Sequence, residues 1–314
     1  MGVVENSKLT VVGAGSVGTS LAYSALIRGS ASEVALYDIA REKVDAEVLD
    51  LAHGTQFTGS SVSGGADLGV VEGSHVIVVT AGAKQQPGQS RLDLAGTNVR
   101  ILENLLPVLL ERAPDAVIVL VTNPVDVLTV AAQRITGLPP HRIFGSGTVL
   151  DTTRLRWLLA RRAGVTTSSV HADIVGEHGD TEFPLWSNAR IGPVPILEWR
   201  GAEPFSAAEL DDIAHEVRDS AYTVIRGKGA TNYAIGLAGS RIVEAVLNDE
   251  RAVLPVSTVL RGIRGLEGVA LSLPSVVGGD GAVPVAETPF SPEEELLLRA
   301  SADAITASVA TLGI

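Results

Sequence analysis

The sequence predicts an α/β protein in which an N-terminal doubly wound parallel sheet is followed by a C-terminal mixed α+β lobe. Over the first half, short continuous apolar runs alternate with helical stretches, which is typical of parallel strands covered on both faces. A glycine-rich turn joins the first apolar run directly to a helix, whereas the second half pairs short strands around turns. Because 314 residues exceed the size of most single cores, we expect two domains, residues 1–147 and 148–314.

Composition excludes several classes of function. The net charge of −12 disfavours nucleic acid and anionic membrane surfaces as partners. The chain has no cysteine for a disulfide, a nucleophile or a metal, and its six histidines lack the paired spacing of zinc sites, so we expect no metal. No apolar run is long enough to span a bilayer, and the N-terminus lacks the features of a signal peptide. We therefore expect a soluble, cytoplasmic protein.

The first predicted strand, Lys8–Val12, leads through a G-x-G-x-x-G turn into a helix at 19–28. In such a turn the first glycine permits the bend, the second lets a pyrophosphate approach the backbone, and the third packs the helix against the strand. The start of the helix favours a phosphate through its free N–H groups and its dipole. The predicted phosphate contacts are Gly13, Gly15, Ser16, Val17 and Gly18.

An acidic residue ends the next predicted strand, Glu33–Asp38. Asp38 lies 20 residues after Gly18, where a carboxylate can accept hydrogen bonds from an adenosine ribose. The same carboxylate repels a 2′-phosphate, so the sequence predicts a Rossmann domain that binds NAD rather than NADP. The alternative is an aspartate that merely ends a strand.

The alternation of strands and helices continues to about residue 147. Strands are predicted at 76–79, 116–121 and 142–145, and helices at 41–53, 92–112 and 125–135. Pro107 predicts a kink or break in the second of these helices. Open α/β sheets bind ligands at the carboxyl ends of their strands. The cofactor contacts expected there are Thr80, Ala81, Gly82, Val121 and Asn123.

Two of these strand ends carry polar segments. We interpret Thr80–Arg91 as a mobile lid that brings Arg91 inward and excludes water, the alternative being a solvated connector. Asn123 follows the next strand, and its amide can bind a substrate oxygen or the cofactor. The alternative is a turn residue, which is favoured before a proline such as Pro124.

Charged residues on a helix begin the second half. Because successive residues are rotated by about 100°, Asp151 and Arg154 share one face, and Arg156 points to roughly the opposite side. We therefore expect the two arginines to bind different ligands, the alternative being surface ion pairs that contribute little. A strand predicted at 170–175 carries His171 without an obvious local partner.

The segment Val175–Asp180 contains the candidate catalytic group. His178 stands between two glycines and among acidic residues. Because imidazole exchanges protons near neutral pH, we predict that His178 is a proton donor and acceptor. The alternative is a loop histidine with an ordinary hydrogen bond.

The remaining elements indicate a mixed lobe. A capping box, Ser206–Glu209, begins a helix that extends to about residue 225, and Thr231 begins another that extends to about 247. Strands are predicted on both sides of a turn at 190–196 and again at 252–260 and 270–277. Ser291 caps a final helix that has a proline at its first position.

Four segments taken together resemble the L-lactate and malate dehydrogenase family, and the resemblance extends from Leu9 to about Leu312. The segments are Ala81–Arg91, Thr122–Asp126, Leu150–Arg154 and Gly176–Asp180. In that family the residue matching His178 is the acid/base, the one matching Asp151 pairs with it, and the one matching Arg154 holds the substrate carboxylate. The resemblance also assigns Arg91 to polarising the substrate carbonyl, and Asn123 and Thr231 to substrate or cofactor contacts.

The resemblance implies a reversible, NADH-dependent reduction of pyruvate to L-lactate. Malate enzymes of the family carry arginine at the lid position held here by Gln85. A neutral amide offers no partner for the second carboxylate of oxaloacetate, which favours pyruvate. The alternatives are a malate dehydrogenase, another L-2-hydroxy acid dehydrogenase and, from a different class, a catalytically silent NAD-binding protein.

The resemblance is also to the bacterial lactate dehydrogenases that respond to fructose 1,6-bisphosphate. In them the residues matching Arg156 and His171 bind the phosphates of this activator across a subunit interface. We therefore expect a homotetramer with an allosteric site at these two residues, the alternative being a surface arginine and a structural histidine. The family resemblance further implies a cis peptide bond between Asn123 and Pro124.

Overall fold

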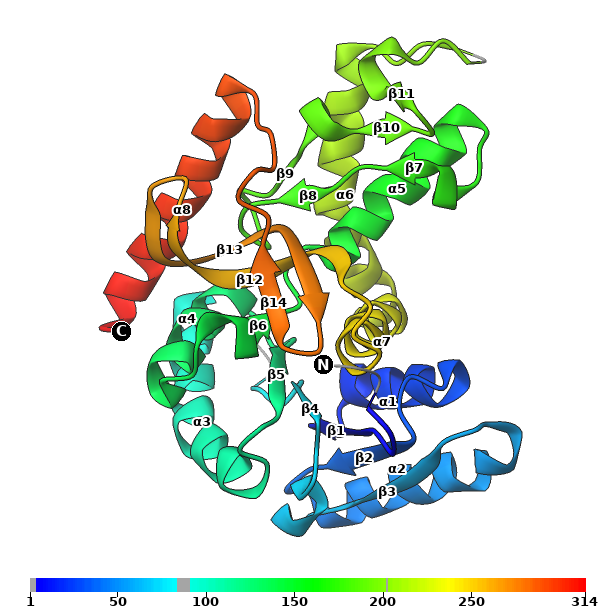
Figure 1. The fold of residues 1–314 in the computed structure, drawn as a ribbon, viewed down its shortest axis with the longest axis vertical. Coiled ribbons are helices and arrows are strands. Elements are labelled where there is room, and N and C mark those ends of the chain that lie inside the picture. Colours follow the sequence, from blue (N-terminus) through cyan, green and yellow to red (C-terminus); the bar gives the residue numbers. More distant parts are fainter. Residues whose placement is uncertain (1–3, 84–90, 202) are drawn as a thin grey trace.

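The computed structural model describes residues 4–83, 91–201 and 203–314, and the side chains of Arg91 and Leu92 lie outside this description. Within the described residues, nine strands form a single sheet in the order β14-β13-β12-β6-β5-β4-β1-β2-β3 (Figure 1). The chain thus forms a parallel sheet extended at one end by antiparallel strands, and the predicted fold class is confirmed.

The first half of the chain supplies the parallel strands and the helices that cover them. The strands are β1 (Lys8–Val12), β2 (Glu33–Tyr37), β3 (Ser61–Gly65), β4 (Val76–Val79), β5 (Val117–Leu120) and β6 (Ile143–Gly145). The helices are α1 (Ser16–Arg28), α2 (Arg41–His53), α3 (Arg91–Arg112) and α4 (Val125–Thr136). The strand order reverses between β1 and β4, which is where open α/β sheets bind their ligands.

Strand β4 shows why the apolar runs have no polar alternation. Val76 and Val78 belong to a core shared with α1 and with α7, a helix from the second half. Ile77 and Val79 belong to the opposite core, which includes side chains of α3 and α4. Because successive side chains of a strand point to opposite faces and both faces are covered, every position must be apolar.

The second half of the chain continues the same sheet and adds a separate group of helices and short strands (Figure 1). Its helices are α5 (Val149–Ala163), α6 (Ala207–Lys228), α7 (Tyr233–Leu247) and α8 (Pro292–Leu312). Its long strands are β12 (Ala252–Ile263) and β13 (Leu266–Gly278), and β14 (Gly281–Pro284) follows them. Its short strands are β7 (Val170–His171), β8 (Ile174–Val175), β9 (Phe183–Pro184), β10 (Arg190–Ile191) and β11 (Val194–Pro195). Strand β12 joins β6 through Ser257 and Gly145, which places the second half directly beside the parallel strands.

Three sequence expectations differ from the structure. Strand β3 was not predicted, because it is a polar, glycine-containing strand at the sheet edge. Of the kink or break predicted at Pro107, the break is wrong, since α3 continues through this residue and a proline removes only one backbone donor from the helix. The strand predicted at 170–175 is two short strands, because β7 pairs with β10 whereas β8 pairs with β9.

Helix starts follow the predicted capping chemistry in two places. Ser206 and Ser291 each accept a hydrogen bond from the third helical N–H, and the glutamate at that position bonds back to the cap. Thr231 is not a cap, because α7 begins at Tyr233 and Asn232 occupies the capping position. None of the helices in the described part of the chain is both long and apolar enough to cross a membrane.

Candidate active site

The candidate site contains two cavities. The first has a volume of about 760 Å³ and lies at the carboxyl ends of β1, β2 and β4. Its wall includes Gly13, Gly15, Asp38, Thr80, Ala81 and Gly82. Two more predicted cofactor residues, Ser16 and Val17, begin α1 beside this cavity. Val121, also predicted, is buried directly after β5. The described wall therefore includes the segments expected to hold a dinucleotide, and helix α3 adds residues that were not predicted, among them Thr97, Arg100 and Asn104.

The glycine turn has the shape that a phosphate requires. A Cβ at Gly18 would overlap the carbonyl oxygen of Gly13, so only glycine lets α1 pack this closely on β1. At Gly15, by contrast, a Cβ would meet no atom within 4 Å. Gly15 caps α1 without a side-chain hydrogen bond, so no capping side chain occupies the first N–H groups of the helix. Open space at a helix N-terminus fits the pyrophosphate of NAD.

Asp38 is fixed beside this turn by two backbone donors. Its Oδ2 accepts a hydrogen bond from the Ala14 N–H at 2.7 Å, and its Oδ1 accepts one from the Ala40 N–H at 2.9 Å. The carboxylate therefore stays at the cavity wall, where it can also accept from ribose hydroxyls. These residues fit NAD, and a 2′-phosphate would meet negative charge at this position.

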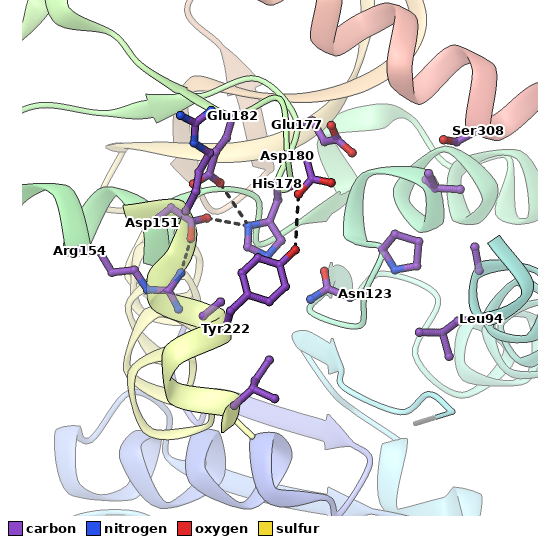
Figure 2. Close-up of a pocket in the computed structure, with 17 residues that line it drawn as sticks. Leu94, Asn123, Asp151, Arg154, Glu177, His178, Asp180, Glu182, Tyr222 and Ser308 are labelled. Carbon is purple, nitrogen blue, oxygen red and sulfur yellow. Dashed lines mark hydrogen bonds and ion pairs between the residues drawn. The ribbon is translucent and has the colours of Figure 1, made fainter. Parts of the chain in front are cut away.

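The second feature is a cavity of about 450 Å³ that contains the candidate catalytic residues (Figure 2). His178 Nδ1 lies 2.6 Å from Asp151 Oδ2, and Arg154 NH1 donates to Asp151 Oδ1 at 2.6 Å. Asn123 lines the same cavity, and its peptide bond to Pro124 is cis, as expected. The structure thus brings together four residues that are up to 55 positions apart in the sequence, Asn123 to His178.

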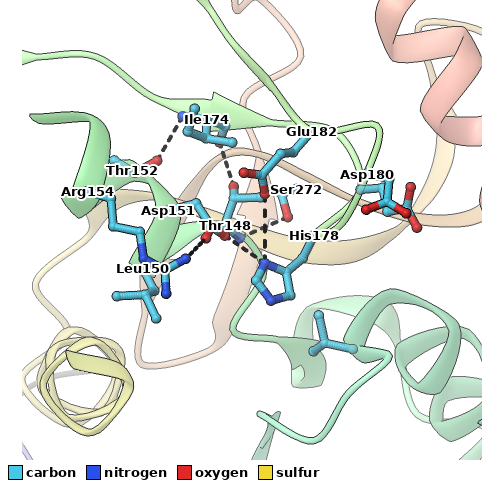
Figure 3. Close-up of polar contacts among 12 residues, drawn as sticks. Thr148, Leu150, Asp151, Thr152, Arg154, Ile174, His178, Asp180, Glu182 and Ser272 are labelled. Atoms are coloured by element: carbon cyan, nitrogen blue, oxygen red, sulfur yellow. Dashed lines mark hydrogen bonds and ion pairs between the residues drawn. The ribbon is translucent and has the colours of Figure 1, made fainter. Parts of the chain in front are cut away.

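Hydrogen bonds hold the segment Ile174–His178, which we call the histidine loop, against α5 (Figure 3). Thr148 Oγ1 donates to the Ile174 carbonyl at 2.5 Å, and Thr152 Oγ1 accepts from the Ile174 N–H at 2.8 Å. Asp151 lies between these two threonines in the first turn of α5, and its side chain is 2% exposed. His178 comes three residues after the end of β8. These bonds therefore help to fix the distance between the Asp151 carboxylate and the His178 imidazole.

The electrostatics of the pair favour the imidazolium form of His178. Burial alone would lower the pKa of His178, but the charge and hydrogen bond of Asp151 outweigh it and raise that pKa to about 9. Burial likewise opposes ionisation of Asp151, yet His178 and then Arg154 lower the pKa of the Asp151 carboxyl below its ordinary value. The two residues therefore form an ion pair at neutral pH, and Arg154 neutralises its second oxygen.

Sequence reasoning missed Glu182, a buried carboxyl whose Oε2 lies 4.0 Å from His178 Nδ1. Burial, followed by the charge of Asp151, raises the pKa of Glu182 to about 9, so its carboxyl is largely neutral at pH 7. Donor atoms of Asp151, His178 and Glu182 all lie within 4.8 Å of one another. A metal ion there would have to compete with the hydrogen bond between His178 and Asp151.

Other residues of the site were also missed. Arg218 and Tyr222 of α6 line the cavity, and the Tyr222 hydroxyl lies 3.5 Å from Asp180 Oδ1. Asp126 was noticed only as part of a family segment, although it contacts the histidine loop. No local pattern marks these residues, because each reaches the site through contacts between segments far apart in the chain.

Several predicted site residues are not among the described residues of this arrangement. Gln85 lies outside the described residues, as does the side chain of Arg91. Thr231 lies just before α7 and is not among the described residues that line either cavity. The remaining two predicted residues, Arg156 and His171, lie on α5 and β7 and are likewise absent from the described walls of both cavities.

Arg156 forms an ion pair, the alternative that the sequence left open for it. Its NH2 donates to Asp173 Oδ1 at 2.8 Å, and its Nε donates to the Ala172 carbonyl at 2.8 Å. His171 is exposed on β7. Arg156 does point away from the site of Arg154, but toward a carboxylate of its own.

The chain matches two family models over nearly its whole length. Residues 7–145 match the NAD-binding domain of lactate/malate dehydrogenase, and residues 148–312 match the α/β C-terminal domain of the same family. The first of these matches agrees with the glycine turn and Asp38, and we identify the cofactor as NAD.

Similar proteins carry the name of one branch of this family. An L-lactate dehydrogenase of Bifidobacterium animalis subsp. lactis is 46% identical, covering 99% of this chain and 98% of its own. One from Lactobacillus helveticus is 42% identical, covering 94% and 92%. The solved structure of a minor L-lactate dehydrogenase from Enterococcus mundtii superposes with a TM-score of 0.93 at 37% identity, covering 98% of both chains. From the two domain matches and these relatives, we conclude that the chain belongs to the lactate/malate dehydrogenase family.

Proposed function

We propose that this protein is an NAD-dependent L-lactate dehydrogenase that reduces pyruvate to L-lactate and catalyses the reverse reaction. The observation that carries this proposal is the contact of His178 with Asp151 and of Asp151 with Arg154 in one cavity. The names of the relatives support the choice of lactate. We also propose residues 1–147 as the NAD-binding domain and 148–314 as the substrate domain, which the ranges of the two family matches support.

His178 is the proton donor in this mechanism. When bound, NADH supplies a hydride to the carbonyl carbon of pyruvate. Because Nδ1 of His178 is held by Asp151, Nε2 is the nitrogen free to give its proton to the carbonyl oxygen. The hydride and this proton convert the ketone to a hydroxyl group, and the neutral imidazole accepts the proton back when lactate is oxidised.

The two arginines have separate roles. Arg154 uses NH1 for Asp151, and its remaining donors can bind the substrate carboxylate in a two-pronged pair that lysine could not reproduce. Arg91 polarises the carbonyl and stabilises the negative charge that develops on its oxygen. Asn123 and Thr231 complete the substrate contacts in this proposal.

Substrate choice depends on Gln85 in this proposal, because an amide leaves the second carboxylate of oxaloacetate without a partner. The test is to measure kcat/KM with NADH for pyruvate, for oxaloacetate and for longer 2-oxo acids. We expect pyruvate to have the highest value. A higher value for oxaloacetate would identify a malate dehydrogenase instead, and absence of turnover with every 2-oxo acid would leave a silent NAD-binding protein.

We also propose that the protein is a homotetramer activated by fructose 1,6-bisphosphate at Arg156 and His171. In support, the Arg156 side chain keeps 32% of its surface exposed, and His171 is exposed on the adjacent β7. Asp173 opposes anion binding because it already pairs with Arg156. Removing that competition in Asp173→Asn should therefore strengthen activation, whereas Arg156→Gln should abolish it.

The test is a pyruvate saturation curve for each variant, with and without the bisphosphate. A half-saturation that the bisphosphate leaves unchanged in the wild type would refute the activation. Equal activation of the wild type and Arg156→Gln would place the activator elsewhere.

A further inference from the structure

Asp126 is a buried carboxyl group that the mechanism above does not use. It occupies the second position of α4, directly after the segment that carries Asn123, and is 2% exposed. Burying a carboxylate is unfavourable unless hydrogen bonds compensate for the lost water. Its partners therefore show what it holds in place.

The carboxylate of Asp126 links three segments of the chain. Its Oδ2 accepts a hydrogen bond from the backbone N–H of His178 at 2.7 Å. Its Oδ1 accepts one from the Ser257 hydroxyl of β12 at 2.5 Å. Both bonds are charge-assisted, and the start of a helix is itself a favourable place for negative charge.

These contacts give His178 two independent supports. Asp151 of α5 holds the imidazole ring through Nδ1, whereas Asp126 of α4 holds the main chain of the same residue. Because Ser257 belongs to the central sheet, the support reaches from the sheet to the histidine. A histidine fixed at both ends has little freedom to move its ring away from the substrate.

We propose that Asp126 is a positioning residue for His178, which it orients through the backbone N–H and whose imidazolium form it favours by its negative charge. This inference rests on the proposed role of His178 as proton donor. This role also explains why a charged group occupies a buried position, where an apolar residue would avoid the unfavourable free energy of removing a charge from water.

The charge of Asp126 acts together with that of Asp151. His178 faces the carboxyls of Asp151 and Glu182 as well as that of Asp126. Asp126 itself faces Ser257, His178 and Glu177. Burial raises the pKa of Asp126 to about 6 although Ser257 and the His178 N–H oppose that rise, so the group is mostly ionised at pH 7.5.

Two substitutions separate orientation from charge. In Asp126→Asn the amide oxygen can still accept from the His178 N–H and the amide nitrogen can donate to Ser257, so orientation is kept and charge is lost. In Asp126→Leu both bonds are lost. We expect Asp126→Asn to lower the pKa of His178 while keeping kcat at pH 6 within about threefold of wild type, since the imidazolium still predominates at that pH.

Loss of both bonds should reduce catalysis rather than cofactor binding. We expect Asp126→Leu to reduce kcat by about 10- to 100-fold, the range expected for a lost hydrogen bond to a charged group. The dissociation constant for NADH should stay unchanged, because Asp126 does not line the nucleotide cavity in the described residues.

The experiment is an NMR titration of ¹⁵N-labelled histidine in the whole protein, with His178→Asn to assign the resonance and kinetics measured in parallel. If Asp126→Leu does not fold, Ser257→Ala replaces it. Loss of the Ser257 hydroxyl raises the pKa of Asp126 above about 6 but leaves the carboxylate ionised near pH 9, where His178 titrates, so the pKa of His178 should change little. The expected effect of Ser257→Ala is a fall in kcat, smaller than in Asp126→Leu, because one of the two bonds of Asp126 is lost. Ser275→Ala is the matched control, because Ser275 is a buried serine of β13 whose hydroxyl bonds to Leu273 of its own strand.

The outcomes separate this inference from the proposed function. A His178 titration that is unchanged in Asp126→Asn would overturn the role of Asp126, even if His178→Asn abolishes turnover and so supports the proposed function. A lowered His178 pKa in Asp126→Asn and a lowered kcat in Asp126→Leu or Ser257→Ala, with Ser275→Ala unchanged in both measurements, would establish the link between Asp126 and His178. That result would hold whether or not pyruvate proves to be the substrate.

Discussion

Replacing Asp151 by asparagine should move the pH dependence of the reaction while leaving cofactor binding intact. Asp151 raises the pKa of His178 against the effect of burial, and it does so through contact at 2.6 Å. Without the carboxylate charge, little opposes the effect of burial, which lowers the pKa of His178. The pKa of His178 should then fall to its ordinary value of 6.5 or below.

The magnitude follows from the two protonation equilibria. A rise in the His178 pKa from 6.5 to about 9 corresponds to roughly 3 kcal/mol of preference for the imidazolium. At pH 7.5 about 97% of His178 is then protonated in the wild type, but only about 10% would be at a pKa of 6.5. Pyruvate reduction should fall about tenfold at this pH from protonation alone, and further because the ring loses its charged partner.

The assay is kcat/KM for pyruvate and for lactate between pH 5.5 and 10. Pyruvate reduction needs the imidazolium, so the wild type should keep full activity below the His178 pKa and lose it as the pH rises through about 9. Lactate oxidation needs neutral imidazole and should show the opposite dependence. Asp151→Asn should move both curves toward acid, whereas Asp115→Asn, a change at an exposed aspartate, should move neither. Unmoved curves in Asp151→Asn would refute the assignment of this ion pair.

Three further predictions concern the cofactor and the substrate. Gly15→Ala should fold normally but bind NADH at least about tenfold more weakly in a fluorescence titration, because its Cβ enters the space that a pyrophosphate needs. Gly18→Ala should instead lower the melting temperature in thermal unfolding, because its Cβ overlaps Gly13. An unchanged NADH affinity in Gly15→Ala would place the phosphates elsewhere. Asp38→Ser should raise kcat/KM for NADPH relative to NADH, since it removes the charge that repels a 2′-phosphate, and an unchanged ratio would remove Asp38 from cofactor selection. Gln85→Arg should raise kcat/KM for oxaloacetate relative to pyruvate, and no gain for oxaloacetate would mean that residue 85 does not face the variable end of the substrate.

Most of the fold could be predicted because its strongest signals are local. The run at β4 is apolar at every position and indicates a strand covered on both faces. The serines at 206 and 291 mark helix starts by a capping pattern contained in four residues. Strand β3 escaped prediction because its pairing with β2 depends on backbone hydrogen bonds, which polar and glycine residues make equally well.

The candidate site was predictable only in part, for the same physical reason. Asp151 and Arg154 are one helical turn apart, so their shared face follows from sequence spacing alone. Asp126 depends instead on a tertiary contact with His178, and spacing gives no sign of it. Glu182 is only four residues from His178, but the segment between them is not helical, so its spacing does not predict that the two side chains face each other. For Arg156, helical spacing predicts where the side chain points but not which residue it contacts. Its partner Asp173 lies in the break between β7 and β8, where a single continuous strand was predicted.

In the proposed reaction His178 supplies the proton, while other residues bind the cofactor. The most direct test compares pyruvate-dependent NADH oxidation by the wild type and by His178→Asn, with NADH affinity measured on the same samples. We expect His178→Asn to bind NADH within about threefold of wild type and to turn over at least about a hundredfold more slowly at pH 7, as expected when a general acid is lost. Turnover by His178→Asn within tenfold of wild type would show that His178 is not the proton donor.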